Sequence, residues 1–273
     1  MPIHVDAELR RMPRPESSRI AYEVMTAVFE VHNELGRFFD EDIYRDEIAR
    51  RRPGIWTEAL IEVTFRDFRK PYFMDLLIDG GLIFELKTVE KLAPRHRSQL
   101  LNYLLLTELT HGKLVNLRSE LVEHEFVNTT LTRQDRTAFT VLEADWHQAA
   151  SNSLDIESLL VEMLRDWGVG LDLHLYEEAL THFLGGEERV IKEIEIVVNG
   201  RVCGKQKVRL TSPDAAFKIT ALGADGKIRF EDHARRFLEH TPLRAIHWIN
   251  LTREQVTFRT LEKERTGKWG TER

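Results

Sequence analysis

The sequence predicts an α/β fold of the α+β kind, in which helices pack on a mixed β-sheet. Apolar residues recur at helical spacing before residue 36, and two strand-like segments flank a glycine-containing turn at residues 79–81. The same order of elements returns in the second half of the chain, which indicates a tandem duplication. We therefore expect two domains, residues 1–140 and residues 141–273.

A helix is predicted over residues 18–35, and a second one over residues 41–51. The first helix has an apolar face that consists of Ile20, Val24, Val28, Val31 and Leu35. Gly36 is a natural stop for this helix, because glycine readily adopts the left-handed conformation that ends many helices. Asp40 stands where a side-chain oxygen can cap the second helix.

Strands and a further helix complete the first half. We expect strands at residues 61–66, 72–78 and 82–88, a helix at residues 95–110, and strands at residues 113–117 and 122–127. In the second half, Tyr176 follows Gly168 by eight residues, as Tyr44 follows Gly36. This shared spacing is one reason to expect a repeat.

Composition and cysteine content limit the class of protein. The 273 residues are 42% hydrophobic and 31% charged, as in a folded soluble protein. No apolar run could span a membrane, the N-terminus lacks the apolar core of a secretory signal, and the single Cys203 excludes an internal disulfide. We therefore expect a cytoplasmic location.

The charge balance bears on contact with nucleic acid. The net charge is −6, with 20 basic against 23 acidic residues in 1–140 and 19 against 22 in 141–273. Any such contact must therefore depend on local basic clusters. Lys91, Arg95 and Arg97 lie before or within the first turns of the helix expected at 95–110, where a phosphate could bind.

The segment Phe73–Lys87, FMDLLIDGGLIFELK, carries the chemistry. Side chains alternate along a strand, so Glu85 and Lys87 point to the same side of the sheet. A three-residue turn at residues 79–81 would place Asp75 opposite Glu85, whereas a two-residue turn would place Asp75 opposite Phe84. Whether Asp75 and Glu85 can act together therefore depends on the length of this turn.

Two carboxylates that lie together repel one another unless a cation joins them. Asp75 and Glu85 could share magnesium or manganese, which prefer oxygen ligands, and Lys87 could then polarise water and offset phosphate charge. That arrangement suits phosphodiester hydrolysis. The alternative is a solvated strand face with an ordinary cross-strand ion pair, and the apolar sequence around the acids favours the functional interpretation.

Residues 20–128 resemble the GxxExxY proteins of the PD-(D/E)xK nuclease superfamily, whose restriction-endonuclease-like core is helix, three strands, helix, strand. Glu41 and Tyr44 match the Glu and Tyr of the family's name, and Asp75 and Glu85-Leu86-Lys87 match the superfamily motif. QLLNYL (99–104) resembles the family's glutamine-containing helix, and HGKLVNL (111–117) the strand after it. Phe38 stands where the family has its glycine, and Met74 where a proline often precedes the acid.

This resemblance implies a role for each matched residue. Asp75, Glu85, the main-chain carbonyl of Leu86 and Glu41 would hold Mg²⁺, for which Mn²⁺ would substitute. Lys87 would activate water, and Gln99 would steady the water or a phosphate. Tyr103 would line the pocket and could contact phosphate. The substrate would be nucleic acid, with DNA favoured over RNA.

The second half lacks the acidic residues. Counting from Tyr176 places Leu173 at the position of Glu41, and counting back from Asn250 places His233 at that of Gln99. Lys218 falls at the position of Glu85 and Thr220 at that of Lys87, with Arg209 near the position of Asp75. We therefore expect a degenerate repeat that packs on the first half as a pseudo-dimer or helps to grip substrate. The rival to a metal-dependent nuclease is a non-catalytic module that binds nucleic acid or protein.

Overall fold

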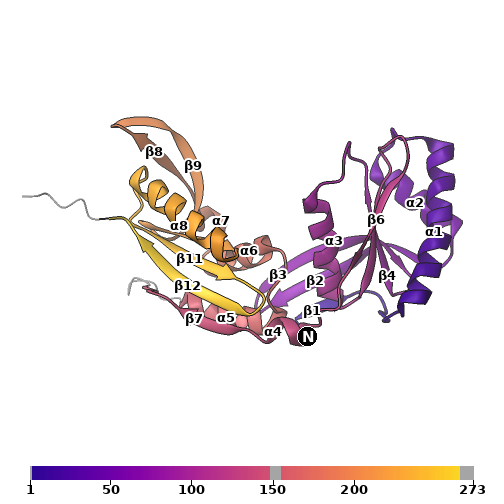
Figure 1. The fold of residues 1–273 in the computed structure, drawn as a ribbon, viewed down its shortest axis with the longest axis horizontal. Helices are drawn as coiled ribbons and strands as arrows, with labels where there is room; N and C mark the ends of the chain where they lie inside the picture. Colours follow the sequence, from indigo (N-terminus) through magenta and orange to yellow (C-terminus); the bar gives the residue numbers. More distant parts are fainter. Residues whose placement is uncertain (1, 148–154, 265–273) are drawn as a thin grey trace, which may run out of the picture. The chain divides into compact units, whose positions relative to one another are not determined.

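The computed structural model describes residues 2–147 and 155–264, and it divides into two compact units. Unit 1 is Met1–Arg136 with Asp166–Asp172, and unit 2 is Thr137–Arg165 with Leu173–Arg273. The division therefore falls close to residue 140, but a short segment beyond it groups with unit 1. Figure 1 shows the elements of both units.

Unit 1 contains two opening helices, a sheet and a crossover helix. The elements are β1 (Ile3–Val5), α1 (Arg14–Leu35), α2 (Glu41–Arg51), β2 (Ile55–Phe65), β3 (Phe68–Ile78), β4 (Leu82–Lys87), α3 (Pro94–Thr107), β5 (His111–Asn116), β6 (Glu123–Asn128) and α4 (Arg133–Thr137). In the described residues the sheet order is β1-β2-β3-β4-β5-β6, with β4 and β5 parallel and the other neighbours antiparallel. The predicted mixed sheet is confirmed.

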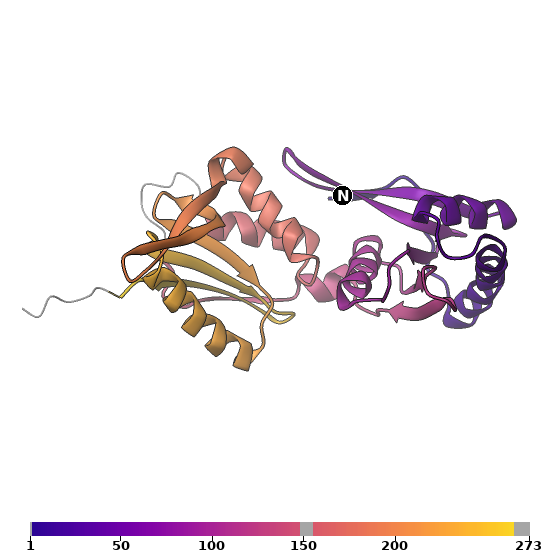
Figure 2. The same cartoon turned by 90° about the horizontal axis from the view of Figure 1, so that it is seen from above.

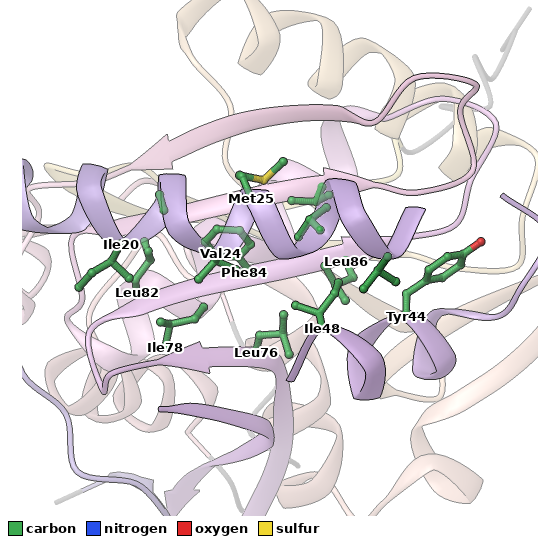
Figure 3. Close-up of a cluster of buried hydrophobic side chains, with 14 of the residues drawn as sticks. Ile20, Val24, Met25, Tyr44, Ile48, Leu76, Ile78, Leu82, Phe84 and Leu86 are labelled. Atoms are coloured by element: carbon green, nitrogen blue, oxygen red, sulfur yellow. The ribbon is translucent and has the colours of Figure 1, made fainter. Parts of the chain in front are cut away.

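The core of unit 1 lies between α1, α2 and one face of the sheet, as Figure 3 shows. Four of the five apolar positions predicted for the first helix are buried there, the fifth, Leu35, is partly buried, and Tyr44 and Ile48 of α2 join them. On the sheet side, Leu76, Phe84 and Leu86 supply the facing side chains. Burial of these groups on one face leaves the alternate residues of β3 and β4 to the other face, toward α3.

Several predicted boundaries differ from the observed ones. Helix α1 begins at Arg14 rather than residue 18, because Pro15 fits the first turn of a helix. Gly36 ends it as expected: its φ is 75°, and its N–H donates to the His32 carbonyl oxygen at 2.8 Å. Asp40 occupies the N-cap position of α2, but its side chain makes no capping hydrogen bond, so this detail of the prediction was wrong.

Unit 2 has a corresponding series of elements. They are β7 (Thr140–Glu143), α5 (Ile156–Trp167, whose last residues group with unit 1), α6 (Leu173–Phe183), α7 (Glu187–Val190), β8 (Ile191–Val198), β9 (Arg201–Ser212), β10 (Ala215–Thr220), α8 (Ala224–Glu239), β11 (Ala245–Leu251) and β12 (Gln255–Glu262). The described strands follow the order β7-β12-β11-β10-β9-β8, and β10 is parallel to β11. Figure 2 shows α8 beside this sheet.

The order of elements therefore recurs, as the sequence predicts. Apart from the short elements β1, α4, β7 and α7, each half has two helices, three antiparallel strands, a helix, a strand parallel to the last of the three, and an antiparallel strand. Asn116 and Asn250 also make the same contacts. Asn116 exchanges hydrogen bonds with the main chain of Val89 at 2.8 and 3.1 Å, and Asn250 does so with Leu222 at 3.1 and 2.8 Å.

Candidate functional site

The turn between β3 and β4 determines which residues meet. Ile78 pairs with Leu82, and Leu76 pairs with Phe84, so the turn is the three residues 79–81. Asp79 and Gly80 have positive φ, at 47° and 69°, so the turn contains the left-handed backbone that a three-residue hairpin needs. The register that brings Asp75 next to Glu85 is therefore the observed one.

Beyond Leu76 the two strands stop pairing in the regular ladder. The Leu86 backbone N–H donates to Asp75 Oδ2 at 2.8 Å, so the carboxylate takes the place of a main-chain acceptor. A backbone donor held in a strand is a fixed partner, and a hydrogen bond to a charged acceptor is stronger than a neutral one. Asp75 is thereby held against β4, beside the side chain of Glu85.

Lys87 lies among three carboxylates. Its Nζ is 2.7 Å from Glu85 Oε1, 3.6 Å from Glu41 Oε1 and 3.9 Å from Asp75 Oδ2. Glu41 is the first residue of α2, and Asp75 and Glu85 lie on the adjacent strands β3 and β4. Four of the residues predicted to form the site thus come together.

Burial makes this cluster electrostatically unbalanced. The Glu85 residue is 1% exposed, and its Oε2 atom is buried without a hydrogen-bond partner among the described residues. Burial, and then the charge of Asp75, raises the pKa of Glu85 to about 8. Burial also raises the pKa of Asp75 and that of Glu41. One ammonium group therefore does not compensate three ionised carboxylates.

Lys87 remains a cation in this environment. Burial lowers the pKa of Lys87, but the charge of Glu85 and the other carboxylates raises it by more, so the net shift is upward. The ammonium group also donates to the main-chain carbonyl oxygen of Leu86 at 2.6 Å. The same carbonyl that the family resemblance assigns to the metal thus lies beside the acids.

The donor set has the chemistry of a divalent-cation site. In the side-chain arrangement described here, no group of three or more His, Cys, Asp or Glu residues is placed to hold a metal ion. The oxygens of Asp75, Glu85 and Glu41 instead surround Lys87 Nζ. The unpartnered Glu85 Oε2 and the excess of carboxylates match what a hard cation with oxygen ligands would satisfy. The residues present therefore fit a divalent cation that prefers oxygen ligands.

Gln99 and Tyr103 lie together on α3. Gln99 Nε2 donates to the Tyr103 hydroxyl at 3.0 Å, which spans one turn of the helix. Burial, and then the charge of Glu85, raises the pKa of Tyr103 to about 12. Tyr103 therefore keeps a neutral hydroxyl, whose pKa the acidic cluster raises. Tyr44, by contrast, donates to the Gly36 carbonyl oxygen at 2.7 Å and packs in the core.

The basic residues predicted to bind phosphate, Lys91, Arg95 and Arg97, make no hydrogen bond or ion pair with the acidic cluster in the part of the chain that the structure describes. Arg97 forms an ion pair with Glu125 of β6 at 2.8 Å, and Arg95 contacts the ring of its neighbour His96 at 3.1 Å. Lys91 is exposed before the helix. Nothing in these contacts directs Arg97 toward the acidic cluster, because Glu125 occupies its guanidinium.

Sequence reasoning missed Arg45. Its charge lowers the pKa of Asp75 and that of Glu41, opposing the effect of burial on both. Arg45 follows Glu41 by four residues on α2, and its guanidinium is held by Glu58 at 3.0 Å and Asp46 at 3.2 Å. The four-residue spacing was the available sequence signal, since it places both side chains on one helix face.

Comparison with known proteins supports the nuclease resemblance of unit 1. Residues 18–128 match the family model of the PD-(D/E)XK nuclease superfamily. A solved structure, that of SSO0001, is similar at 19% sequence identity over 44% of this chain and 61% of that chain, with a TM-score of 0.28, and this likeness supports no further argument. The curated proteins contain no match to the chain. The matched segment contains the whole acidic cluster.

None of the described helices combines the length and the hydropathy that crossing a membrane requires, in agreement with the absence of a long apolar run in the sequence.

Proposed function

We propose that unit 1 is a metal-dependent nuclease that hydrolyses phosphodiester bonds in nucleic acid, with DNA as the favoured substrate. The observation that carries this proposal is the meeting of Glu41, Asp75 and Glu85 around Lys87 within the segment matched by the superfamily model. The finer assignment to the GxxExxY proteins rests on Glu41 and Tyr44, which begin α2.

Asp75, Glu85, the Leu86 carbonyl and Glu41 would hold Mg²⁺ or Mn²⁺. The ion, when bound, supplies charge stabilisation and makes a bound water more acidic. Lys87 would then leave its pairing with Glu85 in part, and its ammonium would hold the attacking water and offset charge that develops on phosphate. Gln99, bonded to Tyr103 at 3.0 Å, would orient that water or a phosphate oxygen by its amide.

A second candidate function is a non-catalytic module that binds nucleic acid or protein and keeps the nuclease fold. The acidic net charge of −6 and the satisfied ion pair between Lys87 and Glu85 favour it. In that case Lys87 would serve as a permanent counter-ion that stabilises the buried acids. The two functions differ in what the chain does to a substrate when metal is added.

The test is degradation of plasmid DNA, labelled DNA oligonucleotides and RNA with Mg²⁺ or Mn²⁺, and with EDTA as the metal-free control. We expect the parent chain to cleave only with metal, and Asp75→Ala and Lys87→Ala to reduce cleavage by about a hundredfold or more. Glu90→Ala is the matched control, because Glu90 is a nearby acid whose side chain is 92% exposed. Equal cleavage by parent, Asp75→Ala and Lys87→Ala would show that the site is wrongly assigned.

A further inference from the structure

A cavity in unit 2 lies where the acidic cluster lies in unit 1. Thr220 pairs with Asn250 as Lys87 pairs with Asn116, so Lys218 takes the place of Glu85. This agrees with the residue counting. The cavity measures about 420 Å³, within the range of small-molecule sites.

The walls of this cavity are largely apolar. They come from α8, β9, β10 and β11, and include Val208, Ala216, Phe230, Ala234, Phe237 and Ile246. Phe230 is stacked on Trp248, with ring centroids 4.6 Å apart and an angle of 29° between the ring planes. A stacked pair fixes the orientation of the Phe230 ring, so the wall is preformed.

Basic side chains line the same cavity. Lys207, Arg209 and Lys218 contribute to the described lining, together with a single carboxylate, Glu177. Glu177 is 2% exposed. Its Oε1 forms an ion pair with Lys218 Nζ at 2.9 Å, and its Oε2 forms one with Arg209 Nη1 at 3.3 Å. The carboxylate is therefore neutralised, and it holds two cations in place while Lys218 stays half exposed. The charges are the reverse of those in unit 1.

We propose that this cavity binds a nucleotide, with its phosphate at Lys218, Arg209 and Lys207 and its base against the apolar wall that includes Phe230. A nucleotide joins an anion to a flat ring, which is the combination that cationic and aromatic groups bind together. A bare anion would leave the apolar wall unused. The site lies wholly in unit 2, so it does not depend on cleavage by unit 1.

The nucleotide could be free or part of a single strand, and binding measurements separate these sources. Fluorescence anisotropy of a labelled oligothymidylate, with the full chain in EDTA, measures binding without cleavage. Unlabelled thymidine monophosphate, an abasic oligonucleotide and inorganic phosphate are the competitors. Unlabelled oligothymidylate is the reference competitor. If thymidine monophosphate competes at the same concentration as this oligothymidylate, the site binds a free nucleotide; if only the oligothymidylate competes, the site binds a nucleotide within a strand.

The double variant Lys207→Ala/Lys218→Ala should bind the probe about tenfold more weakly or worse, because it removes two charged contacts. Lys205→Ala is the matched control, since Lys205 lies on the same strand, is exposed and is outside the cavity lining. It should bind within about twofold of the parent. Asp75→Ala should keep full binding even if it abolishes cleavage, which separates this proposal from the nuclease proposal.

Three results would overturn the proposal. One is equal binding by the double variant and the parent. Another is equal weakening by Lys205→Ala, which would indicate diffuse surface charge. The third is equal competition by inorganic phosphate or by the abasic strand, which would show that no base is bound.

Discussion

At the scale of single residues, the candidate site is defined by a mismatch in charge. Lys87 lies within 4 Å of Glu41, Asp75 and Glu85, and Glu85 has one oxygen that nothing described satisfies. A buried cluster of this composition reaches balance by binding protons or by binding another cation. The first route predicts a dependence on pH, and the second a dependence on metal.

The pH dependence should be visible in the metal-free protein. Burial and Asp75 raise the folded-state pKa of Glu85 from 4.5 to about 8, so the folded chain holds a proton that the unfolded chain releases. The free energy of unfolding should therefore fall as pH rises from 4.5 to about 8. Glu85→Gln should remove this part of the slope, which chemical denaturation at a series of pH values in EDTA can measure.

The expected gain in stability of Glu85→Gln over the parent at pH 8 is of the order of a few kcal/mol, and it should shrink toward pH 5. Glu90→Gln is the control, because an exposed acid should leave the slope unchanged. Parallel pH profiles for the parent and Glu85→Gln would contradict the elevated pKa.

The metal dependence should appear as stabilisation by Mg²⁺ or Mn²⁺. A ligand that binds only the folded state at about a hundred times its dissociation constant stabilises it by about 2.7 kcal/mol. We expect the melting temperature of the parent to rise with metal, and that of Asp75→Ala to respond weakly. If thermal scans show the same shift in both proteins, the ion binds elsewhere.

The sequence could predict that Glu85 and Lys87 share one side of the sheet, because strand alternation is a local property, and it predicted that Asp75 joins them only if the turn has three residues. It could not predict that Asp75 leaves the ladder to accept the Leu86 N–H, since that depends on where two strands diverge. The spacing from Glu41 placed Arg45 on the same helix face, but its effect on the pKa of Asp75 could not be predicted, because it depends on how close the fold brings α2 to β3.

At the scale of elements, the β3–β4 turn holds the site together. Gly80 has φ of 69°, and an added Cβ would lie 2.4 Å from the Glu8 carbonyl oxygen, a backbone atom that cannot easily move. Gly36 has φ of 75°, but a Cβ there would meet nothing within 4 Å. The two glycines therefore share the strain of left-handed backbone but differ in the space around them.

We expect Gly36→Ala to lower the free energy of unfolding by about 1–2 kcal/mol, the usual strain of an L-residue in this conformation. Gly80→Ala should lower it by about 2–4 kcal/mol, since the N-terminal segment must also shift. Urea denaturation measures both. Cleavage should fall in Gly80→Ala, because the turn sets the pairing of β3 with β4. Equal losses of stability would mean that the close approach to Glu8 is unimportant.

The elements also show which patterns are readable in a sequence. Helix α1 is 22 residues long, and its apolar residues recur at helical spacing from Ile20 to Leu35, so its existence followed from spacing alone. Strands β1 and β7 and helix α4 have three to five residues each, too few to show a period, and they were not predicted. Strand β2 begins at Ile55 because its residues pair with β3 from Ile55 onward, with an interruption at Glu58, although its first residues are mostly exposed and lack alternation.

At the scale of the whole chain, one topology carries two different sets of charges. The asparagines at the ends of β5 and β11 bind the main chain after β4 and β10 in the same manner. Acids surround a lysine in unit 1, whereas cations surround an acid in unit 2. We interpret unit 2 as a repeat in which the frame was kept and the polar site was replaced.

That interpretation predicts that equivalent substitutions in the two units have different effects on cleavage. Asn116→Ala removes the hydrogen bonds to Val89, two residues after Lys87, so cleavage should fall by about tenfold or more. Asn250→Ala removes the corresponding bonds to Leu222, and should cost about 1–3 kcal/mol in the stability of unit 2. Its cleavage rate should stay within about twofold of the parent, because the reacting groups are all in unit 1. A loss of cleavage in Asn250→Ala as large as in Asn116→Ala, at a temperature where both are folded, would mean that unit 2 contributes directly to catalysis.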